Sequence, residues 1–108
     1  MSKITPVPKD KRTANYWKEL NKVIDPELNL GVVDLGLIYD VQLEDGHAKI
    51  IMTLTSPACP VGPVLMQQVE DRLRLYNDVQ SVETELVWDP AWTQDLIDPD
   101  IRELMFGL

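Results

Sequence analysis

The sequence contains a single cysteine, Cys59, in a segment that joins a reactive side chain to a restrained backbone. The thiolate is the reactive form of cysteine, and the free N–H groups and dipole at the start of a helix lower a thiol pKa. Cys59 lies a few residues before a helix that we expect to open near Pro63. Pro57 and Pro60 restrict the backbone on either side and predict a defined position for the sulfur. The alternative is a buried, inert thiol.

Polar side chains in two segments accompany this cysteine in the sequence. Thr55 and Ser56 end a predicted strand and could donate hydroxyl hydrogen bonds near the sulfur, although a turn that satisfies the local backbone explains them equally well. Asp25, Glu27 and Asp34 are carboxylates of the kind that perform acid–base chemistry or bind a hard metal ion. Their spacing is not diagnostic of either role, and a turn residue at Asp25 with a solvated Glu27 is the simpler interpretation.

Counting ligands limits the metal chemistry that the chain can support alone. With one cysteine and one histidine, His47, it cannot build a four-ligand zinc or iron–sulfur site from Cys and His. A metal bound through Cys59 must take its other ligands from a second copy, a partner protein or a small thiol. The sequence has no glycine-rich phosphate loop and no evident Ser-His-Asp or Cys-His arrangement, so we expect neither a nucleotide hydrolase nor a conventional hydrolase.

The charge balance restricts the partners. Eighteen acidic and ten basic residues give a formal net charge of -8, which disfavours binding to nucleic acid or to an anionic membrane surface. Proteins or small molecules are the expected partners. The sequence has no apolar run of membrane-spanning length and begins without the apolar core of a signal peptide, so we expect a cytoplasmic protein.

The first half of the chain predicts an arm, a helix and a hairpin. Residues 1–12 lack apolar periodicity and predict a flexible arm, followed by one domain over residues 13–108. Apolar spacing predicts a helix from a Thr13 cap through Ile24, ended by Pro26. Asp45-Gly46 predicts a two-residue hairpin turn. The expected pairs are Leu43 with Ala48, Val41 with Ile50, Tyr39 with Met52, Leu37 with Leu54, Gln42 with Lys49 and Asp40 with Ile51.

The second half predicts a helix, a strand and a short helix. Val64, Leu65, Val69, Leu73 and Tyr76 mark one helical face, and alternation from Val82 to Trp88 indicates a third strand with Trp88 on the core side. Asp98-Pro99 predicts the start of a C-terminal helix. The expected fold is a single compact α/β (α+β) domain with a small mixed sheet and helices on one face, in the order helix, strand, strand, helix, strand, short helix. The stretch from Leu30 to Leu37 is a candidate extra strand.

Four ordered blocks resemble the signature of a known family. The blocks are Asp25-Pro26-Glu27-Leu28, residues 33–39, residues 55–60 and residues 86–92. Together they are similar to the SufT/PaaD-type iron–sulfur assembly domain, and the chain looks like its stand-alone SufT-like members because it lacks a cysteine-bearing C-terminal extension. The resemblance implies a reactive Cys59, hydroxyl positions at Thr55 and Ser56, and acidic positions at Asp25 and Glu27. Ser56 stands where the family pattern has threonine. Asp34, Pro57, Pro60, Trp88, Asp89 and Trp92 are expected to give structural support, and Trp92 is a candidate core, lid or partner residue.

Three hypotheses remain open on this sequence. In the first, Cys59 supplies one thiolate to a transient, shared iron–sulfur cluster that is passed to client proteins, with a homodimer as one arrangement. In the second, the chain is a metal-free adaptor whose acidic surface and apolar end, residues 104–108, bind scaffold, carrier or client proteins. The third is a small enzyme with Cys59 as nucleophile and Asp25 or Glu27 as base, and it ranks last because no positioned histidine supports it. The expectation is therefore a protein that is not an enzyme.

Overall fold

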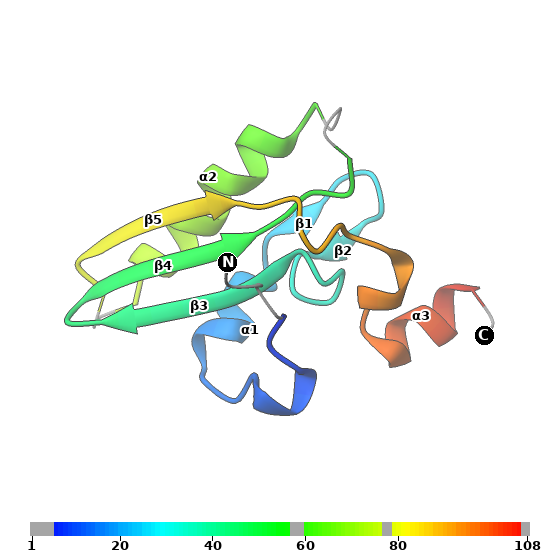
Figure 1. Cartoon of the computed structure of the whole chain (residues 1–108), viewed down its shortest axis with the longest axis horizontal. Coiled ribbons are helices and arrows are strands. Elements are labelled where there is room, and N and C mark those ends of the chain that lie inside the picture. The colour runs from blue at the N-terminus through cyan, green and yellow to red at the C-terminus, as the bar shows by residue number, and fades with distance from the viewer. Residues whose placement is uncertain (1–5, 57–59, 77–78, 107–108) are drawn as a thin grey trace.

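The computed structural model describes residues 6–56, 60–76 and 79–106 of the chain. Its centre is a three-stranded sheet in the order β3-β4-β5, built from β3 (Ile38–Glu44), β4 (His47–Met52) and β5 (Ser81–Leu86) (Figure 1). The sheet is mixed because β4 runs antiparallel to β3 and parallel to β5. The predicted fold class and the order of its principal elements are confirmed.

The hairpin between β3 and β4 follows the predicted register up to a bulge at Tyr39. Asp45 and Gly46 have positive φ angles of 51° and 83°, as this kind of turn requires. The four predicted pairs closest to the turn are present, whereas Ile38, not Tyr39, lies opposite Met52. The Tyr39–Met52 pairing was therefore wrong, and so was the next pair, because the Leu37 carbonyl accepts the N–H of Thr53. The inserted residue allows the buried Tyr39 side chain to leave the ladder.

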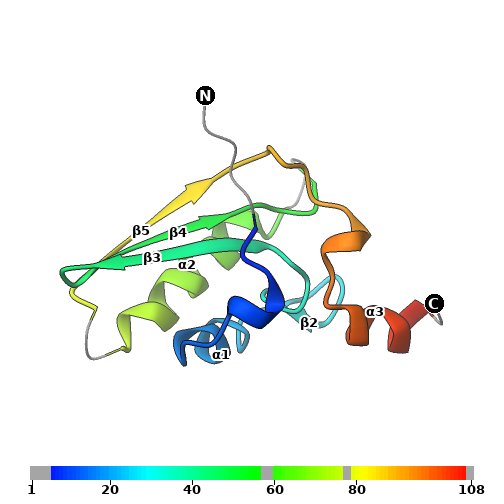
Figure 2. The ribbon, with the colours of Figure 1, turned by 60° about the horizontal axis from the view of Figure 1, so that its bottom comes forward.

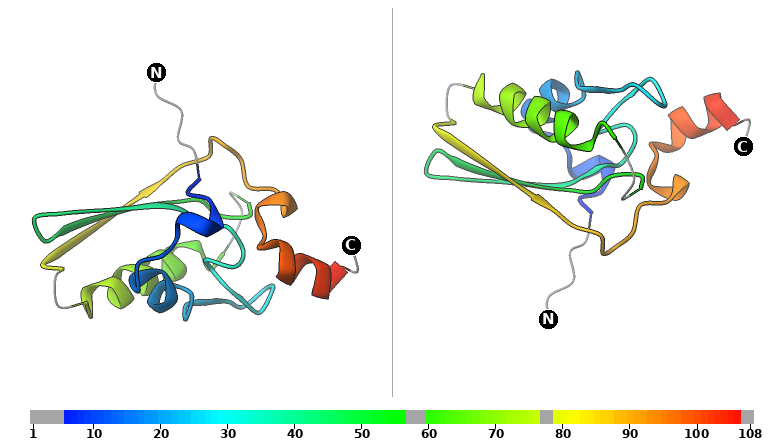
Figure 3. Two further views of the ribbon diagram at one scale, coloured as in Figure 1. Left: turned by 90° about the horizontal axis from the view of Figure 1, so that it is seen from below. Right: turned by 90° about the horizontal axis from the view of Figure 1, so that it is seen from above.

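A crossover helix, α2 (Gly62–Arg74), connects the parallel strands β4 and β5. It follows the predicted position closely and buries Leu65, Val69 and Leu73 against the core. Val64, which was predicted on the same face, is 55% exposed. Helices α1 and α2 lie on the same side of the sheet, whereas α3 extends beyond its end (Figures 2 and 3). The prediction of helices on one face thus holds for the two helices that cover the core.

The first helix, α1 (Tyr16–Leu20), is shorter than predicted. Asn15, not Thr13, is its N-cap residue, and Asn21 ends it. The Asn21 side chain then accepts hydrogen bonds from the N–H groups of Val33 and Asp34, at 3.1 and 2.9 Å. This bond to a distant segment redirects the chain into a small hairpin of β1 (Ile24–Asp25) and β2 (Leu30–Gly31). Ile24, predicted as helical core, is 45% exposed in β1. Strand β2 fulfils the expectation of an extra strand near Leu30.

The N-terminal segment and the C-terminal elements both pack against the core through apolar side chains, Val7 on one side and Ile97 on the other. A short 3-10 helix, η1 (Lys9–Lys11), follows Val7, whose N–H donates to the carbonyl of Tyr39 at 2.8 Å. After β5 come η2 (Gln94–Leu96) and α3 (Pro99–Phe106). Asp98 caps α3 as predicted, because its carboxylate accepts the N–H of Asp100. Within the described part of the chain, no helix is both long and apolar enough to cross a membrane.

Candidate functional site

The parallel pairing of β4 and β5 brings the carboxyl ends of both strands to one edge of the sheet. Met52 lies beside Leu86 in the register, and the N–H of Val87 donates to the carbonyl of Met52 at 2.9 Å. The segment that connects β4 to α2 leaves from this edge, and the segment that contains Trp88 and Asp89 leaves beside it (Figure 1). Two of the four blocks found in the sequence are therefore neighbours in space. In α/β folds the carboxyl end of a parallel strand pair is where functional sites commonly form.

The ends of the segment between β4 and α2 are held together by a contact between Leu54 and Gly62. A β-carbon added at Gly62 would lie 2.5 Å from Cδ1 of Leu54, so a larger residue at this position would require the buried Leu54 side chain to shift. Leu54 and Gly62 are both buried, and Thr53 before them is buried as well. The contact fixes the point where the chain leaves the sheet and the point where α2 begins. Leu54 and Gly62, on either side of residues 55–61 in the sequence, are therefore neighbours in space.

The predicted reactive residues lie between Leu54 and Gly62 in the sequence. Thr55 is half-buried, and Ser56 and Pro60 are exposed. Pro57 and Cys59 fall outside the described residues, so their predicted roles stay predictions. The N-cap position of α2 is Val61, whose side chain has no polar atom to bind the first N–H groups of the helix. Those N–H groups give the start of α2 the partial positive charge that stabilises an anion.

The second and fourth sequence blocks are joined by two hydrogen bonds. Trp92 Nε1 donates to the carbonyl of Leu35, and the Tyr39 hydroxyl donates to the carbonyl of Pro90, both at 2.7 Å. These bonds fix the chain after β5 against the segment before β3. Trp92 is thereby a structural residue, one of the alternatives given above. Trp88, predicted on the core side, is instead 43% exposed at the carboxyl end of β5 because the strand ends at Leu86.

The acidic residues of the first and second blocks have separate local environments. Asp25 is buried and accepts the N–H of Glu27 at 2.8 Å, which makes it a turn residue within the β1–β2 hairpin. Glu27 is exposed. The carbonyl of Asp34 accepts the N–H of Asp98 at 2.7 Å and so anchors the start of α3. The structure thus assigns local structural contacts to Asp25 and Asp34, and any role toward Cys59 stays a prediction.

Arg12 connects the N-terminal segment to the loop before β3. Its Nε donates to the carbonyl of Val7 at 3.0 Å, and its guanidinium lies 5.5 Å from the centre of the Trp17 ring. Burial lowers the pKa of Arg12 below its ordinary value, while the carboxylates of Asp98 and Asp34 act in the opposite direction. A guanidinium stays charged under such opposing influences. Arg12 is therefore a fixed cation that joins residues 7–17 to the loop before β3.

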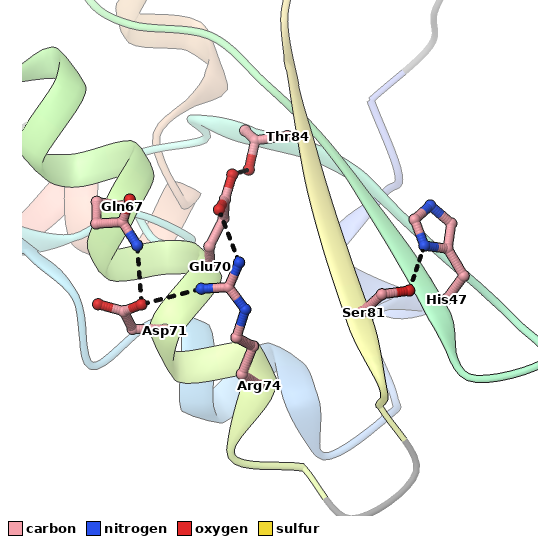
Figure 4. A network of polar contacts seen from close by, with 7 residues as sticks. All are labelled: His47, Gln67, Glu70, Asp71, Arg74, Ser81 and Thr84. Atoms are coloured by element: carbon pink, nitrogen blue, oxygen red, sulfur yellow. Dashed lines mark hydrogen bonds and ion pairs between the residues drawn. The ribbon is translucent and has the colours of Figure 1, made fainter.

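A serine, a histidine and a glutamate that the sequence did not connect lie in a row on the outer face of the sheet. Nδ1 of His47 is 2.7 Å from the Ser81 hydroxyl, a contact drawn in Figure 4, and Nε2 is 2.9 Å from a carboxylate oxygen of Glu83. The hydrogen bond from His47 lowers the pKa of Glu83. All three side chains are exposed. Water screens such a pair, and a hydrolytic triad uses a buried acid to orient its imidazole. The pairing of β4 with β5 places these three side chains next to one another, so a prediction of that pairing from the sequence would have revealed the row.

A second polar network joins α2 to β5 on the inner face of the sheet (Figure 4). The Thr84 hydroxyl donates to Glu70 at 2.6 Å, and Glu70 in turn accepts a hydrogen bond from Arg74. Arg74 also contacts Asp71 at 3.2 Å. This network fixes the crossover helix against the edge strand.

The surface away from this edge of the sheet also contains a groove. A surface groove of about 530 Å³ lies beside the far half of α2, lined in part by Ile24, Arg72 and Leu75. Over residues 6–56, 60–76 and 79–106, no cluster of three or more His, Cys, Asp or Glu side chains could hold a metal ion.

Comparison with known proteins gives consistent matches over most of the chain. A family model described as iron–sulfur cluster assembly protein matches residues 17–84. The chain is 44% identical over 82 residues to the Fe-S protein maturation auxiliary factor YitW of Bacillus subtilis, covering 75% of this chain and 80% of that protein. It is 45% identical over 76 residues to the Fe-S protein maturation auxiliary factor SufT of Staphylococcus aureus, covering 69% and 86%.

The fold also matches a solved structure. A crystal structure of a domain of unknown function, DUF59, from Bacillus anthracis superposes with a TM-score of 0.77 at 34% identity. The match covers 86% of this chain and 89% of that chain. The resemblance that the four sequence blocks indicated is confirmed by these comparisons.

Proposed function

This chain belongs to the iron–sulfur cluster assembly protein family, and from that premise we propose that it is a maturation factor for iron–sulfur proteins. It acts as a carrier or adaptor that helps to deliver clusters to client proteins in the cytoplasm. The observation that carries the proposal is the contact between Leu54 and Gly62. It brings Leu54, which follows β4, next to Gly62, the first residue of α2, at the carboxyl edge of two parallel strands, and Cys59 lies between these two residues in the sequence.

In this proposal Cys59 is a transient thiolate ligand of the cluster, which is cargo. The start of α2, where Val61 makes no side-chain capping hydrogen bond, supports a thiolate because helix N–H groups and the helix dipole stabilise negative charge. Thr55 and Ser56 would donate hydrogen bonds toward the sulfur ligands. Transfer is a ligand exchange in which the bond between iron and Cys59 is replaced by one to a client thiolate, so it requires no oxidant or reductant. The remaining ligands come from a second copy, a partner or a small thiol.

A metal-free adaptor is the second candidate, and one observation favours it. Leu104 on the C-terminal helix is 84% exposed, so its apolar side chain is accessible to another protein. In that case Cys59 is structural or regulatory, and the chain brings scaffold, carrier and client proteins together. Both candidates are non-enzymatic roles with proteins as partners. Only the carrier role includes a homodimer bridged by a shared cluster.

The deciding experiment is anaerobic cluster reconstitution of the parent chain and of Cys59→Ser, followed by iron and sulfide analysis and a visible spectrum. The matched control is His47→Gln, which removes the one histidine of the sequence. Cluster in the parent and the His47 variant but not in Cys59→Ser supports the carrier. Absence of cluster from all three supports the adaptor, whereas full cluster content in Cys59→Ser contradicts the ligand role of Cys59.

A further inference from the structure

Strand β5 is an edge strand, and within the described part of the chain its outward backbone groups have no neighbouring strand. It pairs with β4 alone in the sheet order β3-β4-β5 (Figure 1). The N–H groups of Ser81 and Val87 donate to carbonyls on the β4 side, at 3.1 and 2.9 Å. Because successive residues of a strand direct their backbone groups to opposite sides, Val82, Thr84 and Leu86 direct theirs away from β4. We call these backbone groups the open edge.

Two apolar side chains of β5 next to the open edge are less buried than their register partners in β4. Val82 and Leu86 face the same side as Thr84, which contacts Glu70 of α2. Both are only partly buried, whereas Ala48 and Met52, their register partners in β4, are fully buried. The difference arises because β4 has a strand on each side and β5 has one. A further strand beside β5 would cover the apolar surface that α2 leaves uncovered.

The other face of β5 carries negative charge beside the open edge. The side chains of Glu83 and Glu85 are 58% and 46% exposed, and their contacts to His47 and Lys49 lie on the β4 side. Charged residues on an edge strand oppose pairing with a like-charged strand. A second copy of β5 in antiparallel pairing would place its glutamates across from these two, and like charges directly opposite each other are destabilising. The negative charge of Glu83 and Glu85 therefore disfavours pairing with a second copy of β5. It favours a partner strand that carries basic side chains.

We propose that the open edge of β5 binds an extended segment of a partner protein in which apolar and basic side chains alternate. The backbone of that segment pairs with Val82, Thr84 and Leu86 and extends the sheet by one strand. Its apolar side chains cover Val82 and Leu86, and its lysine or arginine side chains lie beside Glu83 and Glu85. The inference extends the proposed adaptor and carrier roles by naming a partner surface, and it does not involve Cys59.

The test uses the full chain and a short synthetic peptide of alternating valine and lysine, with backbone amide shifts followed by NMR. We expect saturable shifts centred on residues 82–86. A peptide of the same sequence with alternate amides N-methylated keeps its charge and side chains but cannot pair along an edge, and we expect it not to bind. Glu83→Gln/Glu85→Gln should weaken binding of the parent peptide about fivefold, since each exposed cross-strand charge pair contributes modestly.

The matched control is Glu44→Gln/Asp45→Asn, which removes the same charge at the exposed hairpin turn. We expect its affinity for the peptide to equal that of the parent chain. Shifts spread over all acidic residues, equal binding of the N-methylated peptide, or no binding at millimolar peptide would each overturn the proposal. None of these results depends on a cluster, so failure of the open edge leaves the reconstitution experiment unaffected.

Discussion

The side chain of Leu54 occupies the space that a β-carbon on Gly62 would require, with Cδ1 only 2.5 Å from that position. The two residues flank the segment that contains Cys59, and both are buried. Their contact therefore joins the end of β4 to the start of α2 without a hydrogen bond.

Replacing Gly62 with alanine should lower the free energy of unfolding by about 1–3 kcal/mol. Alanine is favoured over glycine in a helix by about 1 kcal/mol, but overpacking a buried contact costs more than that gain. Urea unfolding of the variant measures the change. Adding Leu54→Ala should make the Gly62 substitution far less costly, because the two sites share one volume. Equal costs of Gly62→Ala in both backgrounds would contradict the contact.

Replacing Trp92 with phenylalanine should lower the unfolding free energy by about 1–2 kcal/mol, because the Leu35 carbonyl loses its donor. Trp88→Phe is the matched control, since Trp88 is 43% exposed at the other end of the same segment. We expect the control to change stability by less than about 0.5 kcal/mol. Thermal or urea unfolding followed by circular dichroism measures both. A larger loss in the Trp88 variant would show that the two tryptophans have been assigned the wrong roles.

Stability at alkaline pH should depend on Tyr39. Burial raises the pKa of Tyr39 above its ordinary value, and the hydroxyl donates to Pro90. The unfolded chain then loses this proton first, so the stabilising contribution is complete below about pH 10 and is lost as pH rises through the folded-state pKa. Tyr39→Phe should remove that part of the alkaline decline in urea unfolding. Burial also raises the pKa of Tyr16, so Tyr16→Phe serves as the comparison.

Replacing Arg12 with alanine should lower the unfolding free energy by about 1–2 kcal/mol. The change removes the hydrogen bond to the Val7 carbonyl and the contact with the Trp17 ring. Lys18→Ala is the control, because Lys18 is an exposed cation on the same side of α1 as Trp17 and Asn21. Unfolding of the two variants in urea gives the comparison. Equal losses would mean that net charge, not the position of Arg12, stabilises the N-terminal segment.

Patterns local in the sequence predicted much of the fold. Alternation around Asp45-Gly46 gave the register of the hairpin near its turn, and the spacing of Leu65, Val69 and Leu73 gave α2. These predictions succeed because backbone geometry links residues a few positions apart. Four ordered blocks also sufficed to identify the family. The predicted roles of Cys59 and its neighbours rest on sequence position and resemblance.

Tertiary structure decided the features that depend on distant partners. Asn21 ends α1 early because it bonds to Val33 and Asp34, and the Tyr39 bulge accompanies a bond to Pro90, 51 residues away. The row of His47, Ser81 and Glu83 exists only because β5 returns parallel to β4. Sequence by itself determined the periodic elements, the count of ligands and the net charge, all of which are local or additive. Helix length, the bulge and the open edge depend on which segments meet in space, and only the folded chain decides that.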